Sequence, residues 1–218
     1  MKQQYNIAKM QKKLKKELDD DRYRHTLGVM YTSAALAMRY GADLMKAQVA
    51  GLLHDCAKCI PNDKKLRMCE KYGIPVSHVE NEAPFLLHSK LGAYLARTKY
   101  GVEDEEILQA IVWHTTGKPE MTLLEEIVFL ADYIEPMRWK ASNLAQIRAA
   151  AFVDIHRAVY MTLHDTLQYL SRGSGKVDEM TREACLYYEA LCRKNGEIFG
   201  TDHFERTMES GKEESNGR

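Results

Sequence analysis

The chain has 218 residues, which is enough for one ordinary domain with a complete hydrophobic core. Its 31 lysines and arginines balance 31 aspartates and glutamates, so no net charge would attract nucleic acid or a membrane surface. No apolar run has the length of a membrane span, and the N-terminus lacks the apolar core of a secretion signal. An odd number of cysteines, five, suits reduced thiols. We therefore expect a cytoplasmic protein without nucleic-acid or membrane partners.

Helical patterns dominate the N-terminal half, and no strand-type alternation is sustained anywhere in the chain, which predicts an all-α fold. A first, basic amphipathic helix is expected over residues 2–19, with Tyr5, Ile7, Ala8, Met10, Leu14 and Leu18 on its packed face. Acidic residues at 19–21 and Gly41 delimit a second helix. Asp43 can cap a third helix that ends near Pro61. Further helices are expected at 62–72 and 85–100, with residues 75–84 as a loop.

The C-terminal half continues the helical pattern. A helix is expected over residues 104–114, and Thr122 with Glu125 forms a capping box that opens a helix over 123–135. Residues 142–170 predict one long or two short helices, and 178–195 the last one. We therefore expect one domain over residues 1–198, followed by a polar, disordered tail over 199–218.

The stretch AGLLHDCAK, residues 50–58, places polar atoms next to an apolar core. A helix that buries Leu52 and Leu53 and then presents His54 and Asp55 needs compensation for polar groups in apolar surroundings. A metal ion would compensate both, because neutral imidazole and ionised carboxylate are ligands of divalent metals. The alternative is an ordinary His-Asp pair exposed at a helix end.

Four more segments each carry one metal-capable side chain in an apolar context: His25, His88, His114 and Asp132. A dinuclear metal site would account for all of them together. In this interpretation His25, His54 and Asp132 hold one metal, His88 and His114 hold the other, and Asp55 bridges the two. Imidazole and carboxylate ligands without thiolate suit iron, manganese or zinc.

The remaining histidines lack this context. The second His-Asp pair, His164 and Asp165, is interpreted as a half-exposed helix face. Histidines in a loop or beside charged residues are interpreted as ordinary core or surface residues and not as ligands: His78, His156 and His203. The C-x-x-C formed by Cys56 and Cys59 has neither a second ligand pair nor a βαβ context, so we interpret it as a chance spacing.

A pair of metals can activate water and clamp the oxygens of an in-line displacement, which makes phosphate a natural target. Lys58 and Arg138 would then bind phosphate oxygens, and Asp55 and Lys58 would carry the catalysis. The alternatives are a solvated helix end for Lys58 and an ion pair with Glu135 or a neighbour for Arg138. Residues 115–117, Thr-Thr-Gly, could bind phosphate or ribose through Thr115, Thr116 and Gly117, or form a plain turn at a helix end.

These segments resemble a known family. The chain is similar to the HD-domain metal-dependent phosphohydrolases and, more narrowly, to the YqeK family. The resemblance is carried by HTLGV (25–29), AGLLHDCAK (50–58), LLHSKLGA (86–93), IVWHTTGKPEMT (111–122) and FLADYIEPMR (129–138). It covers roughly residues 5–195 in a consistent order, and the last helix follows the family pattern only loosely.

The resemblance implies an HD-domain helical bundle with a di-iron-type centre that cleaves diadenosine tetraphosphate into two ADP. It implies the ligands His25, His54, Asp55, His88, His114 and Asp132, and it matches Lys58 to the lysine of the family's HDxxK motif and Arg138 to the arginine after Glu-Pro. ADP or GDP would then bind as product-like ligands, and a homodimer stays open. Other readings of the residues also stay open: a different HD-domain nucleotidase or cyclic-nucleotide phosphodiesterase, a non-catalytic nucleotide-binding regulator and, more remotely, an RNA-binding adaptor.

Overall fold

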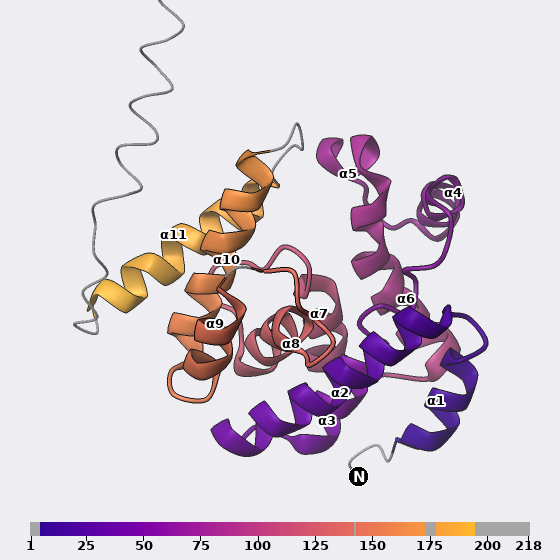
Figure 1. The fold of residues 1–218 in the computed structure, drawn as a ribbon. Helices are drawn as coiled ribbons and strands as arrows, with labels where there is room; N and C mark the ends of the chain where they lie inside the picture. Colours follow the sequence, from indigo (N-terminus) through magenta and orange to yellow (C-terminus); the bar gives the residue numbers. More distant parts are fainter. Residues whose placement is uncertain (1–4, 142, 173–177, 195–218) are drawn as a thin grey trace, which may run out of the picture.

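The computed structural model describes residues 5–141, 143–172 and 178–194, and this part of the chain folds entirely into helices and connecting turns (Figure 1). In chain order, the elements are α1 (Ile7–Leu14), α2 (Asp20–Tyr40), α3 (Leu44–Leu53), α4 (Asn62–Tyr72), α5 (His78–Glu82), the 3-10 helix η1 (Pro84–Leu87), α6 (His88–Tyr100), α7 (Glu105–Trp113), α8 (Leu123–Ile134), α9 (Leu144–Ala151), α10 (Ile155–Ser171) and α11 (Glu179–Lys194). The predicted all-α class is confirmed, and no helix in the described ranges is both long and apolar enough to span a membrane.

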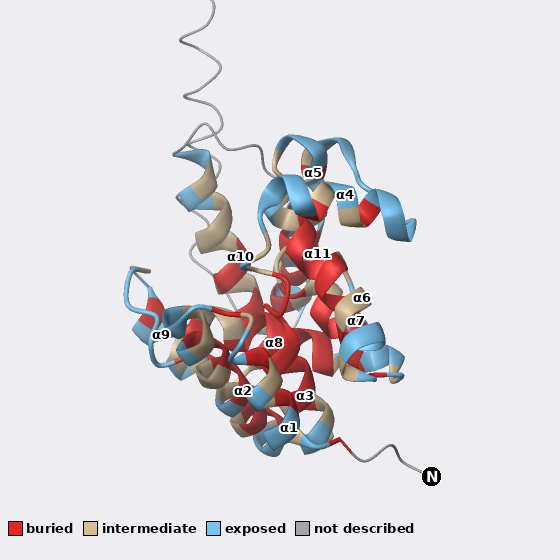
Figure 2. Ribbon diagram, turned by 90° about the vertical axis from the view of Figure 1, so that its right-hand side faces the viewer, coloured by how far each residue is buried: buried red, intermediate tan, exposed pale blue. Residues whose placement is uncertain are grey.

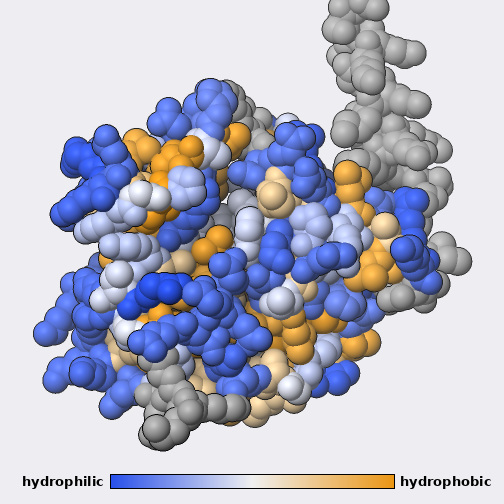
Figure 3. Space-filling model, turned by 180° about the vertical axis from the view of Figure 1, so that it is seen from behind, coloured by the Kyte–Doolittle hydropathy of each residue, from blue (hydrophilic) through white to orange (hydrophobic). Residues whose placement is uncertain are grey.

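The core lies where α2, α3, α7 and α8 pack against one another, with α6 beside α7. Figure 2 shows the buried residues concentrated on α8 and on the faces of α2 and α3 that meet it. The largest fully buried side chains of these helices are aliphatic or methionine: Met30, Leu36, Leu52, Leu53, Ile107, Ile111, Ile127 and Leu130. On the other side, α10 packs against α8, α9 and α11. The surface seen in Figure 3 is mostly hydrophilic, and hydrophobic residues occur there in separate patches.

A small second cluster attaches α4 to this core, and α5 packs against η1 beside it. Four buried residues form its centre: Ala57, Cys69, Leu87 and Leu91. They join α4 to η1 and to the first half of α6, so the α4–α5 unit lies beside the N-terminus of α6 (Figure 1). This arrangement brings the first turn of α4 close to the segment that follows His54.

Most predicted helix ends are confirmed because local capping groups set them. The Asp19 carboxylate accepts a hydrogen bond from the backbone of Arg22 at 2.7 Å, and Gly41 ends α2 with a φ of 73°. Asp43 caps α3, and Thr122 with Glu125 forms the predicted capping box. The segment 142–170 divides into two helices because Asp154 caps a new one, α10.

Several predicted boundaries were wrong. The first helix is shorter than 2–19 because Asn6 caps it at Ile7 and turns follow Leu14, and Ala8 is exposed. The third helix ends at Leu53, and turns carry the chain from there to Pro61.

The segments around Pro84 also differ from the prediction. Residues 75–84 contain α5, which begins at a capping box of Ser77 and Glu80. The helix predicted over 85–100 divides into η1, with Pro84 at its start, and α6. The predicted tail, residues 199–218, lies outside the described residues.

Candidate metal centre

The six predicted ligands, drawn from five helical segments, lie together in the core. They are His25 on α2, His54 at the end of α3, Asp55 in the turn after it, His88 at the start of α6, His114 at the end of α7 and Asp132 on α8. Ring centroids are 5.4 Å apart for His25 and His54, and 5.0 Å apart for His88 and His114. The side chains at the ends of α3 and α7 and at the start of α6 point into the core. This explains why a polar residue follows an apolar run at each of these places in the sequence.

Asp55 lies between two pairs of imidazoles. Its Oδ2 is 3.4 Å from Nε2 of His54 and 3.9 Å from Nε2 of His25. Its Oδ1 is 3.2 Å from Nε2 of His88 and 3.6 Å from Nε2 of His114. Each oxygen therefore faces a different pair of nitrogens, as a bridging carboxylate would require.

Asp132 completes the side of the cluster that contains His25. Its Oδ1 lies 3.0 Å from Nε2 of His25 and 3.8 Å from Nε2 of His54. The ligand atoms form three overlapping groups, each within 4.8 Å: His25, His54 and Asp55; His54, His114 and Asp132; and Asp55, His88 and His114. The geometry brings the predicted residues together, and their role as ligands stays a prediction.

Hydrogen bonds behind the rings orient the histidines. Nδ1 of His54 lies 2.7 Å from the Gly51 carbonyl oxygen. Nδ1 of His88 and of His114 likewise lies 2.6 Å from the carbonyl oxygen of the residue three positions earlier. A carbonyl oxygen only accepts hydrogen bonds, so Nδ1 carries a proton, and in the neutral ring Nε2 is then a lone pair facing the cluster. Such backing hydrogen bonds are typical of metal-binding histidines.

With the imidazoles neutral, electron-pair donors therefore face one another at the centre of the cluster. Nε2 of His25, Nε2 of His54 and Oδ1 of Asp55 are buried without a hydrogen-bond partner in the described structure. Buried polar atoms of this kind are costly unless something satisfies them. Nitrogen lone pairs and carboxylate oxygens that converge in this way fit divalent cations such as iron, manganese or zinc.

The protonation states also suit metal binding. Burial lowers the pKa of His88 to about 4, and the nearby Lys58 adds to that effect, so His88 is neutral at pH 7. Burial alone would raise the pKa of Asp55, but positive charge on the imidazoles, that of His54 first, and the N–H groups of His114, His54 and His88 hold it well below its usual range; a divalent cation at the same place would act in the same direction. The pKa of Asp132 is lowered in the same way against its burial, by His25, His54 and Arg138. Neutral imidazoles and ionised carboxylates are the ligand forms.

Two predicted phosphate-binding residues border this cluster. The Lys58 ammonium lies 3.0 Å from Nε2 of His88 and 3.6 Å from Oδ1 of Asp55, so it is not a freely solvated helix end. The Arg138 guanidinium donates to Oδ1 of Asp132 at 2.8 Å, so the alternative of an ion pair holds in the described structure, with Asp132 and not Glu135 as the partner. Both cations thus lie beside the carboxylates that they would share with a bound phosphate.

In the Thr-Thr-Gly segment, the first residue contacts the cluster and the other two form a turn. The Thr115 hydroxyl lies 3.0 Å from Nε2 of His114 and 3.1 Å from Nε2 of His88. Thr116 donates to the Gly117 carbonyl, and Gly117 ends the turn with a φ of 65°. A substrate contact is therefore best supported for Thr115, while Thr116 and Gly117 have the geometry of a helix-end turn.

Sequence reasoning missed two residues that contact the cluster. Arg22 donates to Oδ2 of Asp55 at 2.8 Å, and Oε1 of Glu135 accepts from Nδ1 of His25 at 3.0 Å. A Cβ at Gly28 would lie 2.4 Å from Oε2 of Glu135, so only glycine leaves room for this carboxylate. Two signals were available: Arg22 precedes His25 by three residues on one helix face, and Glu135 ends an apolar run just before Pro136.

The residues interpreted as non-ligands take part in other contacts. Asp165 accepts a hydrogen bond from Asn143, and the His164 ring lies 5.9 Å from that of Tyr160. His156 lies 2.8 Å from Glu126. Cysteines 56 and 59 are both free thiols, one buried and the other exposed. None of these residues belongs to the groups of potential ligand atoms in the described structure.

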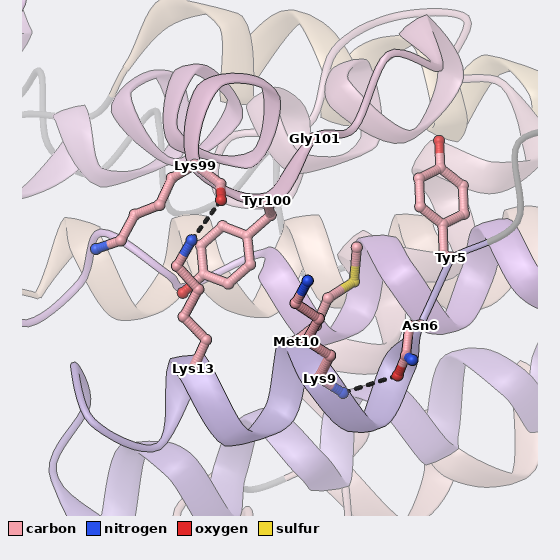
Figure 4. Close-up of a pocket in the computed structure, with 8 residues that line it drawn as sticks. All are labelled: Tyr5, Asn6, Lys9, Met10, Lys13, Lys99, Tyr100 and Gly101. Atoms are coloured by element: carbon pink, nitrogen blue, oxygen red, sulfur yellow. Dashed lines mark hydrogen bonds between the residues drawn. The ribbon is translucent and has the colours of Figure 1, made fainter.

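A pocket of about 290 Å³ lies elsewhere, between α1 and the end of α6 (Figure 4). Lys13 crosses it, donating to the Lys99 carbonyl at 2.5 Å with its ammonium 5.0 Å from the centre of the Tyr100 ring. The residues that line this pocket include none of the predicted ligands. Lys13 therefore provides a hydrogen-bond donor for a backbone carbonyl at the end of α6. The pocket is separate from the cluster of predicted ligands.

The comparisons with known proteins give consistent results. Residues 22–137 match the HD domain family. The chain is 40% identical over 164 residues to a protein of Bacillus subtilis named symmetrical bis(5'-nucleosyl)-tetraphosphatase, an alignment that covers 75% of this chain and 87% of the relative. A protein of the same name from Halalkalibacterium halodurans is 41% identical over 165 residues, covering 76% and 87%. A crystal structure described as a predicted HD superfamily hydrolase involved in NAD metabolism, from Clostridium acetobutylicum, superposes with a TM-score of 0.82 at 37% identity, covering 87% of this chain and 100% of that one.

Proposed function

Because the chain belongs to the HD-domain family that includes the symmetrical bis(5'-nucleosyl)-tetraphosphatases, we propose that it hydrolyses diadenosine tetraphosphate, and related dinucleoside polyphosphates, symmetrically to nucleoside diphosphates. One structural observation carries the proposal. Histidine nitrogens and carboxylate oxygens converge around Asp55, and cationic side chains border them. A site of this kind suits a polyanionic phosphate substrate held at a metal centre.

The metal ligands in this proposal are His25, His54, Asp55, His88, His114 and Asp132. We propose a dinuclear centre with Asp55 as the bridge, because its two oxygens face different pairs of imidazoles. Iron is the first candidate, with manganese and zinc as alternatives. When bound, the metals supply an activated water and offset the negative charge of the phosphate.

The other residues of the chain bind and orient the substrate. Lys58 acts as a compact cation for a phosphate oxygen, and the planar Arg138 guanidinium can grip a phosphate through two nitrogens. Both already lie beside a carboxylate of the cluster, so little rearrangement is needed. No side-chain nucleophile is required. ADP is a weakly basic leaving group, so no protein acid has to protonate it.

The products of the reaction test the proposal. Purified protein would be incubated with diadenosine tetraphosphate and iron, manganese or zinc in separate reactions, and the nucleotides would be separated by chromatography. We expect ADP as the sole product, two molecules for each substrate consumed. ATP and AMP in equal amounts would contradict symmetrical cleavage, and no turnover with any of the three metals would contradict the enzymatic proposal.

A further inference from the structure

Lys65, in the first turn of α4, is a buried lysine. Only 3% of its surface is exposed, although the residues on either side of it, 64 and 66, are exposed or half-buried. Its ammonium donates to Oδ1 of Asn62 at 3.2 Å, a neutral acceptor. Among the residues that the structure describes, no carboxylate lies within ion-pair distance of it. Lys65 thus carries a buried positive charge with one neutral partner.

Other buried charges in the described part of the fold are paired. Glu80 accepts from Lys90 at 2.7 Å, and Glu125 lies 3.0 Å from Lys118. At the metal cluster Asp55 is paired with Arg22. An unpaired buried charge is strongly destabilising, so a protein rarely keeps one without a use. Lys65 differs from these residues because its one partner in the described structure is neutral, so a counter-ion for it would come from outside the chain.

The position of Lys65 links it to the metal cluster. Its pKa is lowered, first by burial and then by repulsion from Lys58, while Asp55 acts in the opposite direction. The first turn of α4 follows directly on the turns that carry Asp55 and Lys58, and α4 packs on η1, which leads into His88. Lys65 lies one turn before Cys69, whose side chain packs with Ala57 and Leu87, the neighbours of Lys58 and His88 in the chain, so Lys65 lies on the face of α4 that packs towards the cluster.

We propose that Lys65 binds a phosphate group of the polyphosphate substrate and, with Lys58, forms a two-lysine phosphate site. The proposal rests on the proposed function for its substrate class. A tetraphosphate carries negative charge on every phosphate and extends beyond the reacting one, so it needs cations other than those at the reaction centre. Phosphate oxygens would supply the missing counter-ion of Lys65.

A purely structural lysine would behave differently. Its aliphatic stem would pack beneath α4, and replacing it would change stability without changing nucleotide affinity. For a lysine that binds phosphate, the effects on stability and on nucleotide affinity should be the reverse. Removal of its charge should leave the nucleotide-free protein as stable as before, or more stable, and weaken binding.

The test compares Lys65→Met and Lys65→Gln with the exposed neighbour variant Lys64→Met. Glutamine is included because it can still hydrogen-bond to Asn62. For each protein, KM and kcat with diadenosine tetraphosphate, ADP affinity by calorimetry and the thermal midpoint without nucleotide would be measured. We expect both Lys65 variants to raise KM and weaken ADP binding roughly 10- to 100-fold, with a smaller effect on kcat and no loss of thermal stability. Lys64→Met should match the wild type, and Lys65→Arg should retain more affinity than either neutral variant.

Wild-type KM and ADP affinity in both neutral Lys65 variants would overturn the proposal. So would a fall in thermal midpoint with affinity unchanged, which is the structural outcome. The ADP measurement keeps this test separate from the proposed function. If the wild type bound ADP but did not cleave diadenosine tetraphosphate, the enzymatic proposal would fail and the role of Lys65 would still be decided.

Discussion

Asp55 offers one carboxylate oxygen to each of two imidazole pairs, so it is the residue on which both halves of the proposed centre depend. Replacing Asp55 with Ala should abolish hydrolysis of diadenosine tetraphosphate and reduce the metal content at both positions. Elemental analysis of the purified variant together with a turnover assay would measure both effects. His164→Ala is the matched control, because it alters the second His-Asp pair and should change neither quantity. Equal losses in the two variants would mean that the wrong pair was assigned.

Gly28 makes room for the Glu135 carboxylate behind His25. In Gly28→Ala the new Cβ would lie 2.4 Å from Oε2 of Glu135 and would displace the group that accepts from the His25 ring. We expect metal affinity to fall by about 10- to 100-fold, as when other partners of metal-binding histidines are lost, with a stability loss of about 1–3 kcal/mol. Metal titration and denaturant unfolding would measure the two effects.

Gly41→Ala provides the control for this substitution. Gly41 has a φ of 73° with no atom near its added Cβ, so alanine there should cost roughly 1–2 kcal/mol through backbone strain alone. It lies at the far end of α2 and should leave metal affinity unchanged. Similar affinity losses in the two alanine variants would show that general destabilisation, and not displacement of Glu135, weakens the site.

The residues that the structure brings together in the cluster could be predicted from sequence because each is a polar side chain in an apolar stretch of about helical length. His54, His88 and His114 all stand where an apolar run meets a helix end, and burial at such a point needs a compensating partner. Arg22 and Lys65 do not stand in apolar stretches, and the three-residue spacing of Arg22 from His25 becomes informative only once His25 is placed in the cluster. Arginine and lysine are common on exposed helix faces, and only the packing of α2 and α4 shows where these two side chains end.

At the scale of the elements, helix limits were predictable where a local side chain sets them. Asp19 and Gly41 delimit α2, and Asp104 begins α7, because caps act within a few residues. The end of α3 was not predictable in this way. The apolar pattern suggests a helix that continues to Pro61, whereas the chain leaves the helix after Leu53 and turns, which directs Asp55 into the cluster. Tertiary packing overrides local propensity at that point.

Three C-terminal elements meet at one buried carboxylate, Glu126 of α8. Its Oε1 accepts from the Tyr188 hydroxyl at 2.7 Å and lies 2.8 Å from Nδ1 of His156. This contact raises the pKa of His156 above its usual value, while partial burial opposes it. The histidine therefore stabilises the fold fully below its unfolded pKa of about 6.5, and this stabilisation is lost as pH rises through the higher folded pKa.

The prediction concerns the difference in thermal midpoint between wild type and His156→Gln. We expect the wild type to be the more stable protein below about pH 6, and the difference to shrink steadily as the pH increases. Unfolding followed by circular dichroism over a pH series would measure it. Other histidines titrate in both proteins and cancel in the difference. A gap that stayed constant with pH, or widened at high pH, would contradict the assigned ion pair.

At the scale of the whole molecule, the cluster joins α2, α3, α6, α7 and α8, the helices that form most of the core. Without a cation, the lone pairs and carboxylates of all five segments face one another, and the cationic side chains at the edge offset this only in part. A bound metal would thus stabilise the fold itself as well as serve the reaction. Loss of the metal should therefore destabilise the core as a whole rather than a single loop.

Metal removal tests this coupling. A metal present at 1,000 times its dissociation constant stabilises the folded state by about 4 kcal/mol, which corresponds to roughly 8–16 °C for a domain of this size. We expect treatment with a chelator, followed by its removal, to lower the thermal midpoint by an amount of this order, and added iron, manganese or zinc to restore it. Asp55→Ala should show little response to either step, since its ligand set is broken. A wild-type midpoint that did not change while elemental analysis showed loss of the metal would mean that the helices converge on the cluster without depending on a cation to hold them there.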